Sequence, residues 1–156
     1  MRVSICAVGR LKSGPERDLV DDYLTRFDRT GRALGLGPAQ VVEVEARKAS
    51  GRSAEGALLL GKIPDRAHVI AMDERGKVQS SPDFAKGLAG LRDQGVPEVA
   101  FVIGGADGLA DPVRARAHAK ISLGKMVWPH MLARVMLAEQ LYRAAMILAG
   151  SPYHRE

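Results

Sequence analysis

The chain has 156 residues, of which 46% are apolar and 26% are charged, so it can bury one continuous core and we expect a single domain over residues 1–156. No apolar stretch approaches the roughly 18 residues of a membrane span, and the strand-like start Met1–Gly9 is too short for a signal peptide; both features predict a cytoplasmic protein with no membrane contact. The net charge of +5 favours an anionic partner such as nucleic acid, while the lone Cys6 excludes an internal disulfide.

The first half of the chain alternates strand-like and helix-like segments. Apolar residues at three- and four-residue steps mark the first helix, whereas short apolar runs between turn residues mark the strands. The predicted order is strand Arg2–Val8, helix Gly14–Phe27, strand Gln40–Glu45, helix Ser53–Leu60 and strand Ala67–Met72. We expect the last of these strands to end in a turn at Asp73–Gly76, because this tetrapeptide is turn-prone.

The second half continues the alternation. We expect Ser81 to cap a helix that runs to about Leu91, with Pro82 at its first position. The remaining elements are predicted as strand Glu98–Ile103, helix Asp111–His118, strand Lys120–Leu123 and helix His130–Ala149. Alternating strands and helices are typical of an α/β domain with a mostly parallel sheet.

Three loops follow the carboxyl ends of predicted strands, where open α/β sheets bind their ligands. They come after Met72, after Ile103 and after Leu123. In the second loop, Gly104 and Gly105 lack the Cβ atoms that would keep a ligand from the backbone, although an ordinary Gly-Gly turn explains the same residues equally well. The spacing fits neither a dinucleotide fingerprint nor a phosphate-binding loop, which argues against NAD and ATP.

The third of these loops, Leu123–Trp128, leaves a strand and enters a helix at Pro129. The proline favours an extended backbone at Trp128. Buried backbone groups of such a loop cannot all pair in regular structure, so we expect a ligand among their partners. The side chains of Met126 and Trp128 are interpreted more simply as packing contacts with the core.

The last predicted helix, His130–Ala149, is apolar nearly all the way round. Such a helix must be buried on more than one side, and packing against a second copy in a symmetric dimer would achieve this. Arg134, near the start of the helix, is placed to hold a phosphate or a base. Glu139 and Arg143 are four residues apart, which indicates either a helix-surface ion pair or a functional role.

The C-terminal segment Ser151–Glu156 carries an aromatic ring, an imidazole and a guanidinium in succession, on Tyr153, His154 and Arg155. These groups stack on bases, move protons and hold phosphates, whereas most chain termini simply fray. The other histidines have no carboxylate or cysteine at metal-ligand spacing. We therefore expect no metal.

Several of these motifs, in this order, resemble the RlmH family, whose members methylate N3 of a pseudouridine in bacterial 23S ribosomal RNA. The matching segments are Phe101–Gly108, Ser122-Leu123 with Met126, Pro129-His130, Leu132–Val135, Glu139–Ala144 and Pro152–His154. The resemblance extends over the whole chain and is specific mainly from Phe101 onward. This sequence departs from the family at Met72, where leucine is common, and at Gly124 and Val127, where serine and threonine are common.

The resemblance implies a SPOUT fold, which is an α/β sheet with a deep trefoil knot near the C-terminus, and a homodimer. It also implies that the knot binds S-adenosylmethionine and that the substrate is RNA of the large ribosomal subunit or of the assembled ribosome. The cofactor-binding residues implied in this way are Met72, Gly104, Gly105, Leu123, Gly124, Lys125, Met126, Val127 and Trp128.

S-adenosylmethionine is an activated methyl donor, so such an enzyme has to align the base nitrogen with the methyl group and help it lose a proton. We expect His154 to assist proton loss, Tyr153 and Arg155 to orient the nucleotide, and Arg134 to hold a phosphate or the base. If the tail of one subunit covers the cofactor site of the other, the active site is shared. The alternatives are a non-catalytic RNA-binding protein and an oxidoreductase with a nucleotide cofactor.

Overall fold

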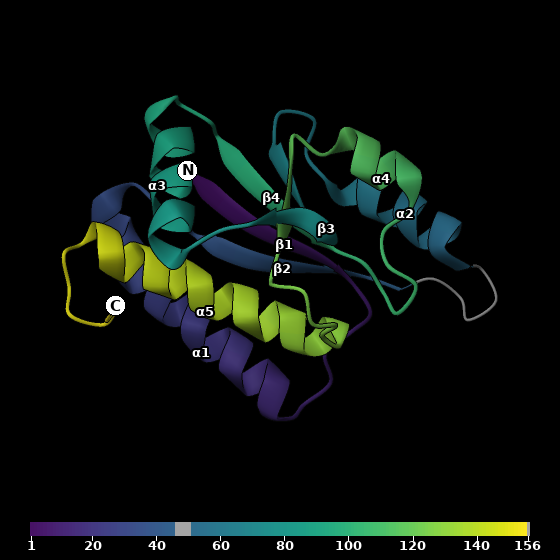
Figure 1. The fold of residues 1–156 in the computed structure, drawn as a ribbon, viewed down its shortest axis with the longest axis horizontal. Coiled ribbons are helices and arrows are strands. Elements are labelled where there is room, and N and C mark those ends of the chain that lie inside the picture. The colour runs from purple at the N-terminus through teal and green to yellow at the C-terminus, as the bar shows by residue number, and fades with distance from the viewer. Residues whose placement is uncertain (46–50, 156) are drawn as a thin grey trace.

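In the computed structural model, which describes residues 1–45 and 51–155, five parallel strands form one sheet in the order β2-β1-β4-β3-β5 (Figure 1). Their bounds are β1 (Arg2–Val8), β2 (Ala39–Val44), β3 (His68–Val78), β4 (Glu98–Ile103) and β5 (Ala119–Ser122). The predicted α/β class and the parallel sheet are confirmed.

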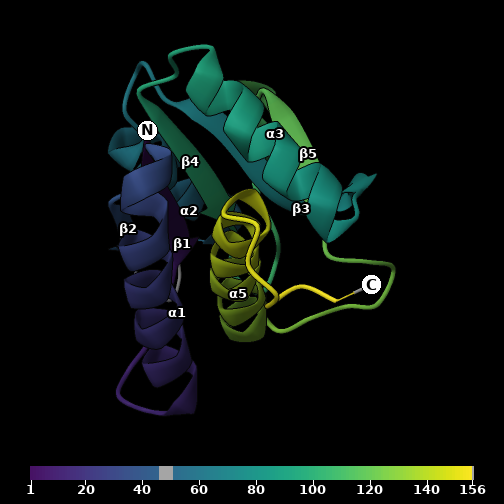
Figure 2. The ribbon, with the colours of Figure 1, turned by 90° about the vertical axis from the view of Figure 1, so that its left-hand side faces the viewer.

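The helices cover both faces of this sheet. Their bounds are α1 (Pro15–Gly31), the short 3-10 helix η1 (Arg32–Leu34), α2 (Gly51–Lys62), α3 (Ser81–Asp93), α4 (Asp111–Arg116) and α5 (His130–Leu148). Helices α1, α3 and α5 lie on one face, with α5 between the other two, and α2 and α4 lie on the opposite face (Figures 1 and 2). The domain therefore has three layers around two apolar interfaces.

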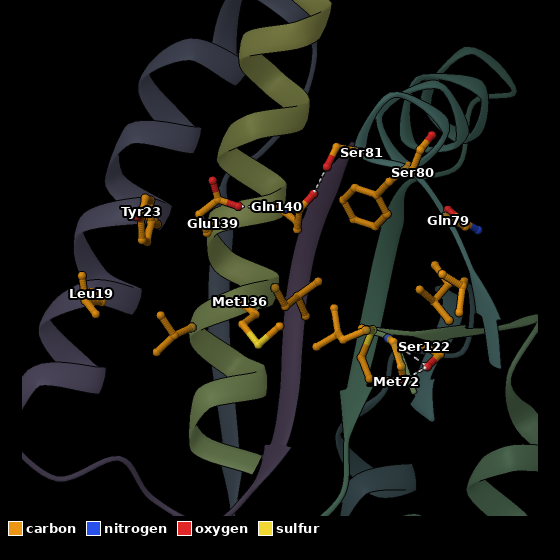
Figure 3. A pocket seen from close by; sticks show the side chains of 17 residues that line it. Leu19, Tyr23, Met72, Gln79, Ser80, Ser81, Ser122, Met136, Glu139 and Gln140 are labelled. Atoms are coloured by element: carbon orange, nitrogen blue, oxygen red, sulfur yellow. Dashed lines mark hydrogen bonds between the residues drawn. The ribbon is translucent and has the colours of Figure 1, made fainter. Parts of the chain in front are cut away.

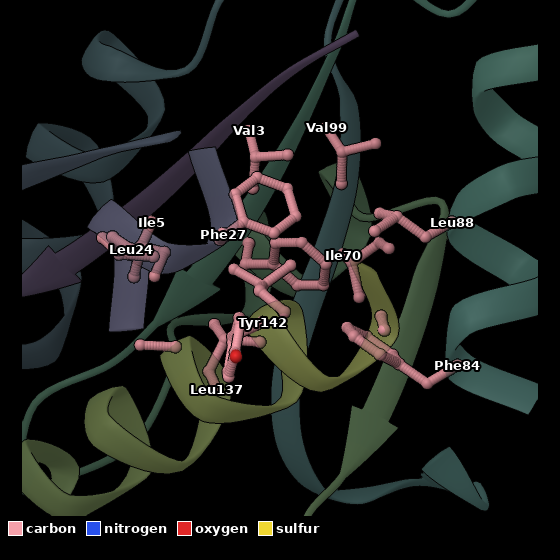
Figure 4. Close-up of a cluster of buried hydrophobic side chains, with 14 of the residues drawn as sticks. Val3, Ile5, Leu24, Phe27, Ile70, Phe84, Leu88, Val99, Leu137 and Tyr142 are labelled. Atoms are coloured by element: carbon pink, nitrogen blue, oxygen red, sulfur yellow. The ribbon is translucent and has the colours of Figure 1, made fainter. Parts of the chain in front are cut away.

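Alternating side chains of the central strands supply both interfaces, as the two-residue period of a strand requires. On β1, Ile5 faces the layer of α1, α3 and α5, whereas Cys6 faces α2 and α4. The first layer includes Phe27 and Leu137, which meet the strand side chains in one cluster (Figure 4). Burying each such large side chain contributes about 1.5 to 3 kcal/mol, and this makes the central strands a rigid support for the loops at their ends.

Most predicted elements agree with the structure to within two residues at each end. Helix α1 is longer than predicted, because the chain stays helical from Phe27 to Gly31, where the helix packs closely on the following segment: a Cβ atom on Gly31 would lie 2.8 Å from the carbonyl oxygen of Leu36. The cap of α3 is Ser80 and not Ser81, since the Ser80 hydroxyl accepts a hydrogen bond from the Asp83 N–H at 3.2 Å.

Strand β3 does not end at Met72 as predicted. It continues to Val78, but its pairing with β5 shifts so that both Met72 and Lys77 lie opposite Ile121. Residues Asp73–Gly76 therefore form a bulge. Gly76 is required there, because a Cβ atom on it would lie 2.6 Å from the backbone of Ile121.

Candidate active site

The loops after β3, β4 and β5 meet at the carboxyl edge of the sheet around a cavity of about 780 Å³. Every residue of the predicted cofactor set except Lys125 lines this cavity. The start of α5 closes another side with His130 and Ala133, and Arg52 of α2 reaches the same space. A volume of this size is typical of a small-molecule or cofactor site.

The glycines after β4 are needed for the path of the chain itself. A Cβ atom on Gly104 would lie 2.6 Å from the carbonyl carbon of Gly108 and 2.9 Å from the nitrogen of Leu109. On Gly105 it would lie 3.1 Å from the carboxylate of Glu55. The turn is closed by a hydrogen bond from the Gly108 N–H to the Gly105 carbonyl oxygen at 3.0 Å. The Gly-Gly pair thus has a structural reason that does not depend on a ligand.

The loop after β5 exposes its apolar side chains. Met126 and Val127 are 74% and 84% exposed, and Trp128 is also exposed. The interpretation of Met126 and Trp128 as core contacts is therefore wrong for this chain taken alone. Met131 and Leu132, at the start of α5, are exposed as well. We call these five residues the apolar patch, and exposed large apolar side chains gathered in this way are typical of a surface that binds a partner or a ligand.

A second cavity, of about 490 Å³, lies across the outer side of α5 and shares Met72, Ile121, Leu123 and Gly124 with the first. Its walls come from α1, the start of α3 and α5, as Figure 3 shows for the labelled residues. Within it the Ser81 hydroxyl donates to Gln140 Oε1 at 2.7 Å, which links α3 to α5.

The surroundings of α5 change the reason for expecting a dimer. Its buried residues face the sheet, α1 and α3 of the same chain, so most of its apolar surface is covered without a second subunit. The uncovered apolar side chains lie at its N-terminal end, in the apolar patch. The apolar side chains of α5 that a second subunit could still cover therefore lie at this end and not all round the helix.

Arg134 does not lie where an RNA contact needs it. Its side chain is 0% exposed, and its guanidinium donates to Glu43 Oε1 at 2.9 Å and to the carbonyl oxygens of Val8 and Gly9 at 3.2 and 3.1 Å. Burial lowers the pKa of Arg134, and the Glu43 carboxylate opposes this shift. The expectation that Arg134 holds a phosphate or a base is corrected: the residue joins α5 to the ends of β1 and β2.

The tail does not fray over Tyr153 and His154. The Tyr153 hydroxyl donates to Glu139 Oε1 at 3.2 Å, and its ring packs 4.7 Å from that of Tyr142. His154 Nδ1 lies 3.3 Å from a guanidinium nitrogen of Arg143. Burial, followed by the nearby Glu139 carboxylate, raises the pKa of Tyr153 to about 12, so its phenol stays protonated and acts as a donor.

The Glu139–Arg143 ion pair, at 2.6 Å, is thus confirmed, and it also anchors the tail. Arg155 is exposed, and Glu156 lies outside the described residues. Sequence reasoning considered the helix pair and the tail separately, because nothing in their spacing showed that the tail folds back on α5.

Two residues of the first cavity were not anticipated. Asp73 and Arg114 both line it and form an ion pair between Oδ2 and Nε at 2.5 Å. The position of Asp73 directly after a buried strand was an available signal. Arg114 gave none, since three residues after Asp111 it resembles an ordinary helix charge pair.

Cys6 lies in the core and lines neither of the two cavities. Burial, with a smaller effect of Glu98, raises the pKa of the Cys6 thiol to about 11, so it stays protonated in the core.

Over residues 1–45 and 51–155, no cluster of three or more histidine, cysteine, aspartate or glutamate side chains is arranged to hold a metal ion. In the same part of the chain, no helix has the length and hydropathy to cross a membrane.

Comparison with known proteins identifies relatives over almost the whole chain. The family described as "Predicted SPOUT methyltransferase" matches residues 1–154. A protein of Dinoroseobacter shibae named ribosomal RNA large subunit methyltransferase H is 66% identical over 155 residues, covering 99% of both chains. A protein of Roseobacter denitrificans with the same name is 68% identical over the same length and coverage.

Solved structures resemble the fold at low sequence identity. A probable methylase family protein from Haemophilus influenzae has a TM-score of 0.53 and 13% identity, covering 99% of this chain and 70% of its own. A probable methyltransferase from Bordetella pertussis has a TM-score of 0.50 and 19% identity, covering 92% of this chain and 96% of its own. These two likenesses concern the fold alone.

Proposed function

The chain belongs to the ribosomal RNA large subunit methyltransferase H family of SPOUT methyltransferases, and from this premise we propose that it transfers a methyl group from S-adenosylmethionine to N3 of a pseudouridine in 23S ribosomal RNA. The observation that supports this best is the cavity where three strand-end loops meet, lined by the residues that the family resemblance selects. The two rival functions, a non-catalytic RNA-binding protein and an oxidoreductase, do not agree with this membership.

The residues around the cavity fit S-adenosylmethionine. The cofactor carries a cationic sulfonium, an amino group and a carboxylate, and the cavity wall offers charges of both signs on Glu74, Arg75 and Arg52. Its adenine and ribose need close backbone and apolar contacts, which the loops after β4 and β5 supply. When bound, the cofactor provides an electrophilic methyl group, so the chain has no need of a covalent nucleophile.

The protein's own contribution is to orient the pyrimidine and to accept the proton from N3. His154 is the proposed proton acceptor, since histidine is the side chain that most often acts as a general base in enzymes. Tyr153 and Arg155 are proposed to orient the nucleotide through stacking and phosphate contacts. Arg134 has no direct contact with RNA in this scheme, because its side chain is buried between α5 and the ends of β1 and β2.

The tail is held beside the C-terminal half of α5, whereas the proposed cofactor cavity of the same chain lies at the N-terminal end of that helix. His154 is held beside Arg143, whereas α5 reaches the cavity at Ala133. Ten residues of α-helix separate these points, which is about 15 Å at the usual rise per residue. We therefore propose a homodimer in which the tail of one subunit completes the site of the other, with the apolar patch in or beside the interface.

Ribosomal RNA fits the charge of the chain, which carries 23 lysine and arginine residues against 18 aspartate and glutamate residues. Cationic side chains supply the sequence-independent part of RNA affinity through phosphate contacts. We infer that the partner is the large ribosomal subunit or the assembled ribosome, and that the protein acts in the cytoplasm. We also infer that residues 1–156 form a single domain. The chain is proposed to pass around the cofactor in the trefoil knot of the family.

The test is mass spectrometry of 23S ribosomal RNA from a strain that lacks this protein. We expect one pseudouridine to lose a mass of one methyl group, and the parent gene to restore it. Purified protein should also gain thermal stability from S-adenosylmethionine and S-adenosylhomocysteine but not from NAD. Unchanged RNA together with no stabilisation by either methyl-donor ligand would refute the proposal.

A further inference from the structure

The bulge of β3 is held in place by one carboxylate. Asp73 Oδ1 accepts a hydrogen bond from the Arg75 N–H at 2.9 Å, and Oδ2 accepts from Arg114 Nε at 2.5 Å. The Asp73 side chain is only 3% exposed. Burial alone would raise the pKa of Asp73, but its backbone and guanidinium donors lower it overall. The group is therefore a charged carboxylate at neutral pH, with both oxygens used inside the protein.

Arg114 reaches from this bulge to the loop Gly104–Gly108 after β4, which we call the glycine loop. It stands on α4, and its Nη2 lies 3.8 Å from the position that a Cβ atom on Gly108 would take. Its Nη1 also donates to Asp111 Oδ1 at 3.2 Å, and Asp111 does not line the cavity. The bulge and the glycine loop form two walls of the 780 Å³ cavity, so one guanidinium lies between both walls.

Regular sheet pairing does not hold the bulge, which is the first of these two walls. The ladder between β3 and β5 skips from Met72 to Lys77, so the four residues between them depend on the Asp73 contacts and on the packing of Gly76. A buried ion pair adds little to stability compared with apolar residues of the same size, and its directional hydrogen bonds fix geometry more than they raise stability. We infer that Asp73 and Arg114 are positioning residues that set the spacing of the two cavity walls for the methyl donor; this rests on the proposed function.

The inference predicts a selective loss of donor affinity. Asp73→Asn keeps the shape and an acceptor for the Arg75 N–H but removes the charge, and Arg114→Met keeps much of the volume. Titration calorimetry with S-adenosylmethionine and S-adenosylhomocysteine should show Kd raised about 10-fold for the first variant and about 100-fold for the second, because preorganisation of the site is lost. Arg114→Lys, which keeps one charged donor, should fall between Arg114→Met and the parent.

Kinetics separate positioning from a general loss of structure. With ribosomes as substrate, the KM for the donor should rise with Kd, while kcat at saturating donor stays within about threefold of the parent, as for an interaction made equally in the ground and transition states. Asp111→Asn is the matched control: it removes a carboxylate from the same arginine, but one that is 87% exposed and does not join the two walls. Its Kd should stay within about twofold of the parent.

The outcomes distinguish this inference from the function on which it rests. If the parent binds the donor and folded Asp73→Asn and Arg114→Met bind it with parent-like Kd, the positioning role is wrong and the methyltransferase assignment stands. A fall in kcat with unchanged KM would also refute it. A parent that binds neither donor nor product would overturn both.

Discussion

Arg134 of α5 donates a hydrogen bond of 2.9 Å to Glu43 of β2, although the arginine is completely buried. The same carboxylate oxygen accepts from the Leu11 N–H at 3.0 Å. The guanidinium also donates to the backbone at the end of β1. Since the loop Leu123–Trp128 leads through Pro129 into α5, this pair fixes one end of that loop against the sheet.

The two halves of this pair should differ in how much they stabilise the fold. Glu43→Ala leaves a buried, unpaired guanidinium and should lower the free energy of unfolding by about 3 to 5 kcal/mol. Arg134→Met removes the buried charge itself, and the remaining Glu43 can reach water, so this loss should be smaller, about 2 kcal/mol. Urea unfolding followed by circular dichroism measures both.

Asp22→Ala is the control for this comparison, because it breaks a surface ion pair with Arg26 on α1 and should leave the urea midpoint unchanged within error. Equal losses for Glu43→Ala and Arg134→Met would contradict the view that an unpaired buried charge dominates the cost.

Sequence reasoning could predict the order of the strands and helices because each has a clear period of apolar residues. It predicted that three loops would meet around one cavity, because the carboxyl ends of parallel strands lie at one edge of the sheet. It misplaced Arg134, since an arginine on an otherwise apolar helix has the same local pattern whether it faces RNA or a carboxylate 91 residues away in sequence. The bulge of β3 and the folding back of the tail were missed for the same reason: both depend on contacts distant in sequence.

The glycine loop should tolerate no side chain at Gly104. Because a Cβ atom there would lie 2.6 Å from backbone that cannot move aside cheaply, Gly104→Ala should cost about 1 to 3 kcal/mol of stability and weaken S-adenosylmethionine binding. Gly87→Ala is the matched control, since this glycine lies in α3 with open space around its Cβ position. That variant should gain about 0.5 to 1 kcal/mol from helix propensity. Parent-like stability of Gly104→Ala would mean that the loop differs from the one described.

Two stacked histidines should make stability depend on pH. His68 and His118 lie with ring centroids 4.5 Å apart, and His118 Nδ1 accepts from the Val69 N–H at 2.9 Å. Burial, and then the charge of His118, lowers the pKa of His68. The unfolded chain therefore takes up a proton more readily than the folded one, and stability should be lost as pH falls through the ordinary histidine pKa of about 6.5.

Thermal unfolding between pH 7.5 and 5.5 measures this slope. His68→Phe keeps a stacked ring without a titrating group, so it should flatten the slope. Asp73 does not interfere, because the pKa of an unfolded aspartate is about 3.9 and the fold lowers it further, so both states are ionised throughout this pH interval. A His68→Phe variant with the parent slope would show that other groups control the acid sensitivity.

The proposal that the active site is shared between two subunits can be tested by complementation. A protein lacking residues 151–156 keeps its cofactor cavity but has no tail, whereas Gly105→Val keeps the tail but places a branched side chain at the cavity, where even a Cβ atom would lie 3.1 Å from the Glu55 carboxylate. Each should methylate ribosomes poorly alone. Co-expressed with different tags, half of the dimers should be mixed, and each mixed dimer should contain one complete site.

Activity should therefore return to about a quarter of the parent rate, the fraction of sites completed in randomly paired two-fold dimers. A tail that served its own chain would give no recovery, because no single chain in the mixture has both parts. Mixing the tail-deleted chain with His154→Ala is the control. If His154 accepts the proton, this pair should show at least a roughly 100-fold deficit in single-turnover rate. His154→Ala homodimers supply a quarter of the sites in this mixture and mixed dimers another quarter. If the mixture therefore recovers about half of the parent rate, Tyr153 or Arg155 supplies what the tail contributes, and His154 only binds.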